Sequence, residues 1–217
     1  MKPNGIYALA ETYLTELYPD AACGLEYDHN GYRLLTAAIL SAQCTDKRVN
    51  EVCVTLFSRW PDAASLAAAD VEDIAAVIRS VGLYNAKARN LKECCSMLVS
   101  IHGGTVPSDM DSLLALPGVG RKIANLIRGD LYGLGGIVAD THMIRFCNRL
   151  GFTDKPDPLT TERTMQEIIP LRSQSDFCHK AVLFGRDICR ARQPRCGMCR
   201  LSEVCRYHSD IETENGT

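Results

Sequence analysis

The chain has 217 residues, of which 46% are hydrophobic and 23% charged, and its formal net charge at pH 7 is −2. This composition is typical of a soluble globular protein that can bury a core, and it excludes a disordered, collagen-like or fibrous chain. No stretch approaches the roughly 18 to 20 apolar residues of a membrane span, and the opening Met-Lys-Pro-Asn-Gly lacks the apolar run of a secretory signal. We therefore expect a cytoplasmic protein with no membrane association.

Charge is distributed unevenly along this nearly neutral chain. Residues 1–30 carry one basic and five acidic side chains, whereas residues 186–207 carry six arginines and two acidic side chains. A basic segment of this kind is compatible with an anionic partner, but also with an ordinary solvated surface.

Helical periodicity dominates the sequence. In 46–59 the apolar residues recur at i, i+3, i+4, i+7 and i+8, which predicts a helix capped by Thr45 or Asp46 and ended by Trp60-Pro61. The same spacing predicts helices at 71–78, 88–98, 113–116, 165–169 and 177–184. The apolar run 137–139 is too short to indicate a strand. We predict an all-α protein of roughly ten short helices.

Eleven cysteines, an odd number, argue against a disulfide framework in a chain without an export signal. Four of them crowd into the segment 189–205: Cys189, Cys196, Cys199 and Cys205. Tetrathiolate zinc sites usually contain two CxxC-like pairs. This array has one CxxC with single cysteines outside it, which is closer to iron–sulfur ligation, although zinc stays an alternative. We predict a metal centre here and seven cysteines that serve only in packing.

The segment 116–122 has the sequence Leu-Pro-Gly-Val-Gly-Arg-Lys and lies between two predicted helices. The turn at Gly118, Val119 and Gly120 allows positive φ angles, and its free N–H groups could bind an anion such as a DNA phosphate. Helices on both sides exclude a dinucleotide-binding fingerprint. Lys122, in the first turn of the second helix, is a candidate Schiff-base nucleophile, a phosphate contact or a solvated lysine.

The segment 138–142, Val-Ala-Asp-Thr-His, follows a glycine-rich stretch and precedes a helical run. Asp140 is most simply an N-cap, and His142 a helix residue with a local hydrogen bond. A catalytic role for Asp140 requires that the fold bring it near Lys122.

These three segments, in this order, resemble the endonuclease III family of DNA glycosylases within the helix-hairpin-helix superfamily. The segment 116–122 is similar to the family's hairpin, 139–142 to the segment with its catalytic aspartate, and 189–205 to its iron–sulfur loop. Two more segments match, 40–46 (Leu-Ser-Ala-Gln-Cys-Thr-Asp) and 81–88 (Val-Gly-Leu-Tyr-Asn-Ala-Lys-Ala). The similarity covers about residues 32–207.

The resemblance implies an all-α, two-lobed helix-hairpin-helix DNA glycosylase fold. Residues 24–134 would form a six-helix lobe with the hairpin, and residues 1–23 and 135–217 a discontinuous helical lobe. The second lobe would hold a [4Fe–4S] cluster on Cys189, Cys196, Cys199 and Cys205. Double-stranded DNA with a damaged base or an abasic site would bind in the cleft between the lobes, where Lys122 and Asp140 would face each other. The protein would act as a monomer, of a bacterial or archaeal type associated with the nucleoid.

The resemblance also implies a bifunctional DNA glycosylase and AP lyase that removes oxidised pyrimidines in base excision repair. Lys122 would attack C1′, expel the base and form a Schiff base that β-eliminates the 3′ phosphate, while Asp140 would stabilise positive charge on the sugar. The base must first leave the duplex. Gln43 would fill the vacated space and Leu83 would wedge into the opposite strand, although the residues alone indicate a surface or cap glutamine and a core leucine.

Three arginines between the first two cysteines of the loop would contact the phosphate backbone: Arg190, Arg192 and Arg195. Lys122 separates this chain from the adenine-mismatch glycosylases, which lack that lysine. Alternatives are an AP lyase or mismatch-specific glycosylase with another base preference, a non-catalytic iron–sulfur DNA-binding module, and a zinc-binding interaction domain. A pure binding module needs neither Lys122 nor Asp140, and that reading would leave both unexplained.

Overall fold

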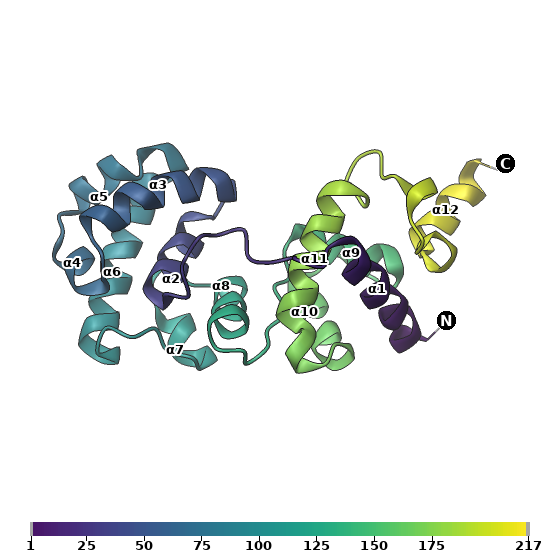
Figure 1. The fold of residues 1–217 in the computed structure, drawn as a ribbon, viewed down its shortest axis with the longest axis horizontal. Coiled ribbons are helices and arrows are strands. Elements are labelled where there is room, and N and C mark those ends of the chain that lie inside the picture. The colour runs from purple at the N-terminus through teal and green to yellow at the C-terminus, as the bar shows by residue number, and fades with distance from the viewer. Residues whose placement is uncertain (1, 216–217) are drawn as a thin grey trace. The chain divides into compact units, whose positions relative to one another are not determined.

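The structure is a computed structural model that describes residues 2–215 (Figure 1). Within this range every regular element is a helix, which confirms the all-α prediction. None of these helices is long and apolar enough to cross a membrane. The chain divides into two compact units, Cys23–Tyr132, here called the hairpin unit, and Met1–Ala22 with Gly133–Thr217, here called the cysteine unit.

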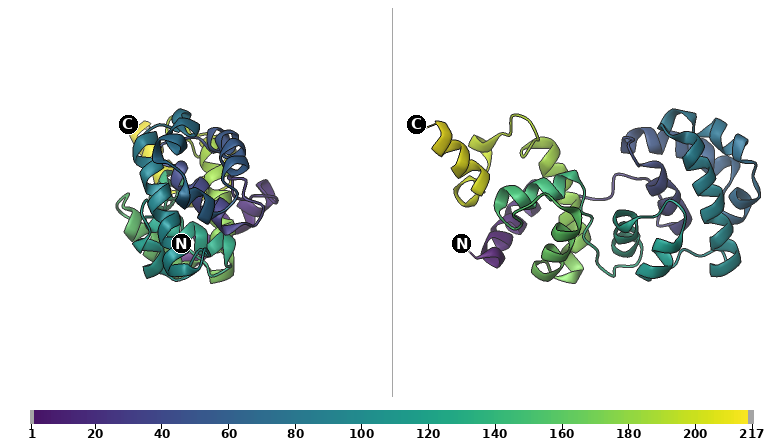
Figure 2. Two further views of the ribbon diagram at one scale, coloured as in Figure 1. Left: turned by 90° about the vertical axis from the view of Figure 1, so that its left-hand side faces the viewer. Right: turned by 180° about the vertical axis from the view of Figure 1, so that it is seen from behind.

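The hairpin unit is organised around its longest helix, α6, against which α4 and α5 pack (Figures 1 and 2). Its elements in chain order are α2 (Gly31–Leu40), α3 (Asp46–Arg59), α4 (Ala63–Ala68), α5 (Val71–Val77), the 3-10 helix η1 (Arg79–Val81), α6 (Tyr84–His102), α7 (Met110–Ala115), α8 (Arg121–Leu126) and the π-helix η2 (Ile127–Leu131). Its core is mainly aliphatic and includes fully buried residues from α2 to α6: Leu34, Leu56, Leu66, Ile74, Leu91 and Leu98.

Helix α3 shows how the sequence determines these elements. Its predicted apolar stripe is buried without exception: Val49, Val52, Cys53, Leu56 and Phe57. Of the two predicted caps, Thr45 is the N-cap, and its hydroxyl accepts a hydrogen bond of 3.3 Å from the Arg48 amide. The helix ends at Arg59, with Trp60 as its C-cap, because the residue before a proline avoids helical backbone angles.

The cysteine unit joins an N-terminal helix to the C-terminal third of the chain. Its elements are α1 (Pro3–Leu17), α9 (Thr141–Leu150), α10 (Pro158–Ile168), the 3-10 helix η3 (Leu171–Ser173), α11 (Gln174–Asp187), the 3-10 helices η4 (Cys196–Met198) and η5 (Ser202–Val204), and α12 (Arg206–Asn215). Helix α11 packs against α9 and α1, and α12 packs beside α9. The core centres on Phe146, whose ring meets Phe177 and Phe184 edge-on.

A buried lysine ties the N-terminal helix to α11. Lys180 is 4% exposed, and its ammonium donates to Thr15 Oγ1 at 2.9 Å and to Asp176, and lies 3.8 Å from Glu11 Oε1. Because Thr15 and Glu11 belong to α1, this network fixes the start of the chain to the unit that its C-terminal third builds.

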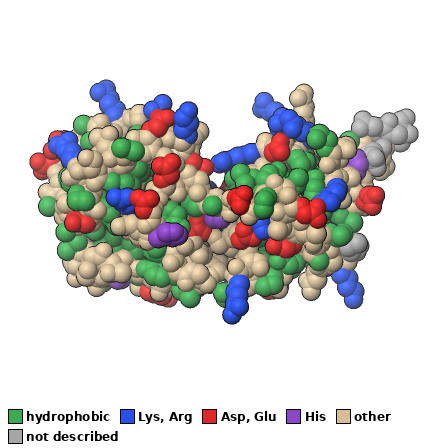
Figure 3. All heavy atoms as spheres, viewed as in Figure 1, with side chains coloured by type: hydrophobic (Ala, Val, Ile, Leu, Met, Phe, Trp, Pro, Cys, Tyr) green, Lys and Arg blue, Asp and Glu red, His purple; other side chains and the backbone are tan. Residues whose placement is uncertain are grey.

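Basic and acidic side chains are interspersed on the face of the molecule drawn in Figure 3. Clustered charge therefore does not single out a binding surface on that face.

Candidate active site and metal centre

Helices α7 and α8 are joined by a short turn that needs glycine at one of its two glycine positions. Gly118 has φ +81°, and a Cβ there would lie 3.2 Å from Asn90 Cβ and 3.3 Å from Ile39 Cγ2. Gly120 is extended, with φ −104° and ψ 177°, and a Cβ there would have no neighbour within 4 Å. Packing within the chain thus explains Gly118, and it leaves an open space in front of the Gly120 backbone.

The hairpin presents two cationic side chains to solvent directly after this turn, Arg121 and Lys122. Lys122 is the second residue of α8, is exposed, and makes no hydrogen bond or ion pair with the described residues of its own unit. Val119, by contrast, is 8% exposed and packs in the core, so only its backbone is available to a ligand. The hairpin therefore offers a primary amine and turn backbone on a rigid support.

Asp140 occupies the N-cap position of α9, as the sequence predicts. Its Oδ1 accepts hydrogen bonds from the amides of His142 at 3.0 Å and Met143 at 2.8 Å. Both bonds go to the same oxygen, so the cap fixes the carboxylate without using Oδ2. The side chain is half-buried, so the Asp140 carboxylate has a fixed orientation and is partly shielded from water.

His142 forms the local hydrogen bond that the sequence predicts, between its Nδ1 and Arg145 Nη2 at 3.1 Å. Burial lowers the pKa of this imidazole, and the positive charges of Arg145 and Arg186 lower it further, whereas Asp140 acts in the opposite direction. The ring is therefore kept neutral beside the Asp140 cap, and the carboxylate has no imidazolium partner next to it.

Gln43 and Leu83 share an unusual backbone state. Gln43, between α2 and α3, has φ +55°, and Leu83, between η1 and α6, has φ +49°. Residues with a Cβ rarely adopt these left-handed angles, which cluster at functional sites. Both side chains are exposed, Leu83 by 62%, so the interpretation of Leu83 as a core leucine is wrong.

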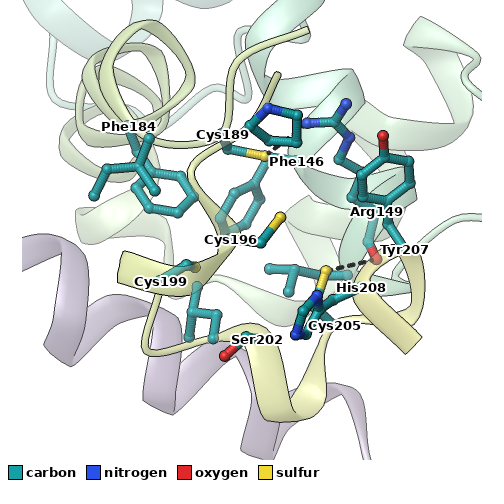
Figure 4. A pocket seen from close by; sticks show the side chains of 14 residues that line it. Phe146, Arg149, Phe184, Cys189, Cys196, Cys199, Ser202, Cys205, Tyr207 and His208 are labelled. Atoms are coloured by element: carbon teal, nitrogen blue, oxygen red, sulfur yellow. Dashed lines mark hydrogen bonds between the residues drawn. The ribbon is translucent and has the colours of Figure 1, made fainter. Parts of the chain in front are cut away.

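The four clustered cysteines line one pocket at the end of α11 (Figure 4). Cys189 follows α11, Cys196 begins η4, Cys199 follows it, and Cys205 follows η5, and all four are half-buried. Phe146, Phe184, Ile188 and Leu201 supply apolar walls. Within the described residues no three His, Cys, Asp or Glu side chains form a group fit for a single metal ion.

The electrostatics of this pocket favour a positively charged ligand. Burial raises the pKa of the Cys199 thiol to about 11, and the neighbouring cysteines act in the same direction, because several thiolates in one place repel each other. Arg149 places a positive charge beside one of these sulfurs: its Nη1 donates to Cys189 Sγ at 3.3 Å and to the Arg190 carbonyl at 2.7 Å. Soft thiolates in an apolar pocket are the donor set of iron–sulfur clusters, so the residues fit such a group.

The remaining cysteines follow the packing prediction. All eleven are free thiols, and Cys53, Cys94, Cys95, Cys147 and Cys178 are buried in the two cores. Cys23 and Cys44 are half-buried against the core of the hairpin unit.

The three arginines of the cysteine loop are exposed but differ in their contacts. Arg195 Nη1 forms an ion pair of 3.1 Å with Asp187, and Arg190 Nε donates to the Arg186 carbonyl at 3.3 Å. Arg192 has no hydrogen bond or ion pair to the part of the cysteine unit that the structure describes. Arg192 is therefore the most available of the three for an external anion.

Besides Lys180, sequence reasoning missed two buried cations, Lys87 and Arg149. Lys87 lies on the same helical face as Leu91, Cys94 and Leu98, and Arg149 lies between buried Phe146 and Leu150. A charged residue inside an apolar stripe was the available signal, since such a residue must find partners in the interior.

Known proteins resemble this chain over most of its length. The family model described as HhH-GPD superfamily base excision DNA repair protein matches residues 36–171, which is more than half of the chain. An endonuclease III from Synechocystis sp. is 44% identical over 193 residues, 88% of each chain. The endonuclease III of Escherichia coli strain K12 is 36% identical over 201 residues, which cover 93% of this chain and 95% of the relative.

Solved structures agree with these sequence relationships. A trapped endonuclease III–DNA covalent intermediate matches with a TM-score of 0.91 and 38% identity, over 98% of this chain and 100% of the other. A thermostable thymine-DNA glycosylase has a TM-score of 0.84 and 23% identity over 94% and 97%, which shows the shared fold alone. Fold and hairpin thus define a helix-hairpin-helix protein of base excision DNA repair. Within that class, the chain belongs to the endonuclease III family.

Proposed function

We propose that this chain is a bifunctional DNA glycosylase and AP lyase of base excision repair that removes oxidised pyrimidines from double-stranded DNA. The observation that carries the proposal is Lys122, an exposed primary amine in the first turn of α8, directly after the family's hairpin. The relationship to endonuclease III proteins, one of which is described as a trapped covalent DNA intermediate, supports this assignment.

Lys122 acts as the nucleophile in this proposal. Its Nζ forms a bond to C1′ of the damaged nucleotide while the bond from C1′ to the base breaks, and the base departs with the electron pair. The bound amine loses one proton, the bond from C1′ to the ring oxygen breaks, and that oxygen takes up a proton as the sugar ring opens, which leaves a protonated Schiff base between Nζ and C1′. Removal of a C2′ proton then expels the 3′ phosphate and cleaves the strand by β-elimination.

Asp140 stabilises the positive charge that develops on the sugar as the base leaves. The two amide hydrogen bonds to Oδ1 hold the carboxylate in one orientation, so it needs little rearrangement during the reaction. Lys122 belongs to the hairpin unit and Asp140 to the cysteine unit. We propose that the lobes 24–134 and 1–23 with 135–217 each contribute one catalytic residue to the same nucleotide, and the two compact units support this division.

Two exposed loops and two phosphate contacts complete the proposed DNA interface. Gln43 fills the space of the extruded base, and Leu83 wedges into the opposite strand; their exposure and left-handed backbone support these roles. The hairpin backbone at 118–120 receives a phosphate in the open space at Gly120. The second phosphate contact is formed by the loop arginines Arg190, Arg192 and Arg195.

The endonuclease III family implies a [4Fe–4S] cluster, and we propose that the four pocket thiols hold it: Cys189, Cys196, Cys199 and Cys205. When bound, such a cluster cross-links the loop 189–205 to the end of α11. The Arg149 guanidinium supports one thiolate and the loop backbone together, because it donates to Cys189 Sγ and to two carbonyls, those of Arg190 and Ala191. The loop arginines are thereby presented on a fixed backbone.

Borohydride trapping tests the nucleophile. The protein is incubated with a duplex that contains thymine glycol, or with an abasic-site duplex, and reduced. We expect a covalent protein–DNA product on both, lost in Lys122→Ala. Lys47→Ala is the matched control, because Lys47 is also an exposed second residue of a helix in the hairpin unit, and it should keep the product.

The other outcomes separate the alternatives. Trapping on the abasic duplex alone indicates a lyase, or a glycosylase for a different base. No trapping on either duplex, with DNA binding intact, contradicts the assignment of Lys122 and favours a non-catalytic DNA-binding module.

A further inference from the structure

A buried lysine lies directly behind the two loops that carry Gln43 and Leu83. Lys87 is the fourth residue of α6 and is 5% exposed. Its Nζ donates three hydrogen bonds, to the carbonyls of Leu40 at 2.8 Å, Ala42 at 2.7 Å and Val81 at 2.7 Å. All three ammonium hydrogens are therefore used, and all three acceptors are backbone.

The acceptors explain why a cation is held at this position. Leu40 is the last residue of α2 and Val81 the last residue of η1, so the charge lies at the carbonyl ends of two helices, where a cation is favoured. Lys87 has no carboxylate partner among the described residues of the hairpin unit. Burial lowers the pKa of Lys87. An apolar residue at this position would avoid the cost of desolvating the ammonium group. The value of Lys87 therefore lies in the segments that its three hydrogen bonds connect.

The bonds connect the backbones on which the two exposed side chains stand. Ala42 directly precedes Gln43, and Val81 lies two residues before Leu83. The Lys87 amide also donates to the Leu83 carbonyl at 3.1 Å. One residue thus holds the segment before Gln43 with its side chain, and both sides of the Leu83 turn with its side chain and its backbone.

We propose that Lys87 is a positioning residue that fixes Gln43 and Leu83 relative to each other, so that both enter the duplex in one step of base extrusion. This inference rests on the roles proposed above for these two residues. Two side chains that enter a DNA duplex together need a fixed distance between them. Left-handed backbone at both positions persists only when the surrounding structure imposes it. The three bonds of Lys87 impose it from a single point.

The test compares two lysine-to-methionine variants in the same helix. Lys87→Met removes the charge and all three donors at nearly the same volume. Lys92→Met is the matched control, because Lys92 also lies in α6 and its Nζ donates to a single backbone carbonyl, that of Ala69, at 2.7 Å. Ala69 is remote in sequence from both loops, so Lys92→Met should change stability without changing extrusion.

Extrusion is measured by stopped-flow fluorescence of 2-aminopurine placed beside thymine glycol, and base removal is measured in single turnover. We expect Lys87→Met to slow both by about 10- to 100-fold, since small misplacements of positioning groups have effects of this size. Schiff-base trapping on an abasic duplex, which has no base to extrude, should fall by a smaller factor. Lys87→Arg, which keeps the charge and donors, should recover part of the extrusion rate.

A double-mutant comparison separates positioning from general stability. If Lys87 acts through the two loop residues, Lys87→Met should add little to the defect of a Gln43→Ala, Leu83→Ala protein. Additive effects, or equal losses in extrusion and abasic trapping, would overturn the proposal. If Lys87→Met does not fold, the same comparison with Lys87→Arg decides it.

Different results would contradict the proposed function itself, on which the inference for Lys87 rests. Normal extrusion by the Gln43→Ala, Leu83→Ala protein would contradict the roles of these two residues, and with them the inference for Lys87. Absence of base removal by the wild-type protein on every lesion tested, with trapping on abasic DNA retained, would instead contradict the proposed base preference.

Discussion

The two glycines of the hairpin give opposite predictions for the same substitution. Gly118 has a left-handed backbone and close neighbours, whereas Gly120 is extended and faces open space. Replacing each by alanine adds one methyl group within the same turn. The pair therefore separates what the fold requires from what a ligand requires.

The expected difference in stability follows from the backbone angles. An L-residue in the left-handed region costs roughly 1–2 kcal/mol, and in Gly118→Ala the methyl group also meets Asn90 Cβ at 3.2 Å. Alanine restricts the unfolded chain equally in both variants, which stabilises by about 0.4–1 kcal/mol where the native angles allow it. Gly118→Ala should therefore be about 1–2 kcal/mol less stable than Gly120→Ala.

Urea unfolding and DNA binding of both variants test this reasoning. We expect a lower unfolding midpoint for Gly118→Ala than for Gly120→Ala, at unchanged slope. DNA affinity, measured by fluorescence anisotropy, should fall for Gly120→Ala despite its intact fold, because the methyl group occupies the space proposed for a phosphate. Equal midpoints would refute the argument from the backbone angles, and wild-type affinity in Gly120→Ala would refute the phosphate contact.

Three further substitutions test the site. Asp140→Asn should keep its stability, because asparagine caps helices as well as aspartate, but slow single-turnover base removal by roughly 10²–10³-fold; an equal loss of DNA affinity would make Asp140 structural. Replacing the three loop arginines by alanine should reduce the slope of log affinity against log salt by about 0.9 for each DNA phosphate that the protein no longer neutralises. Arg192→Ala should reduce the slope more than Arg195→Ala does. Arg172→Ala, which removes an exposed arginine elsewhere in the unit, is the control and should leave the slope unchanged. Cys199→Ser should lose the brown colour and visible absorbance of an iron–sulfur protein together with the ordered loop; a colourless wild-type protein that contains zinc would contradict the cluster assignment.

The sequence predicts the amphipathic helices of this fold well and the buried ones poorly. Helix α3 has one apolar face, so its stripe and both of its ends could be predicted from spacing and caps. Helix α2 has eight buried residues out of ten, so no polar face marks its period. Periodicity detects a helix only through the contrast between its two faces, and α2 has almost none.

Two features of the site could be predicted because they are local in sequence. The Asp140 cap and the hairpin turn depend on a few consecutive residues, so their sequences are sufficient to indicate them. The left-handed angles at Gln43 and Leu83 could not be predicted, because glutamine and leucine have no preference for that region. The segments before both residues accept hydrogen bonds from Lys87, and for Ala42 this contact spans 45 residues of sequence, which local sequence does not indicate.

Among the described residues, the partners of the three buried cations distinguish two uses of interior charge. Lys180 is near carboxylates, Asp176 and Glu11, and joins one helix to another. Lys87 and Arg149 instead donate mainly to backbone carbonyls of loops and helix ends. A carbonyl belongs to the main chain, so a cation bound to several carbonyls fixes the path of a loop whatever side chains that loop carries. In the proposed DNA interface, this arrangement would let the exposed loop side chains vary while the loop geometry is preserved.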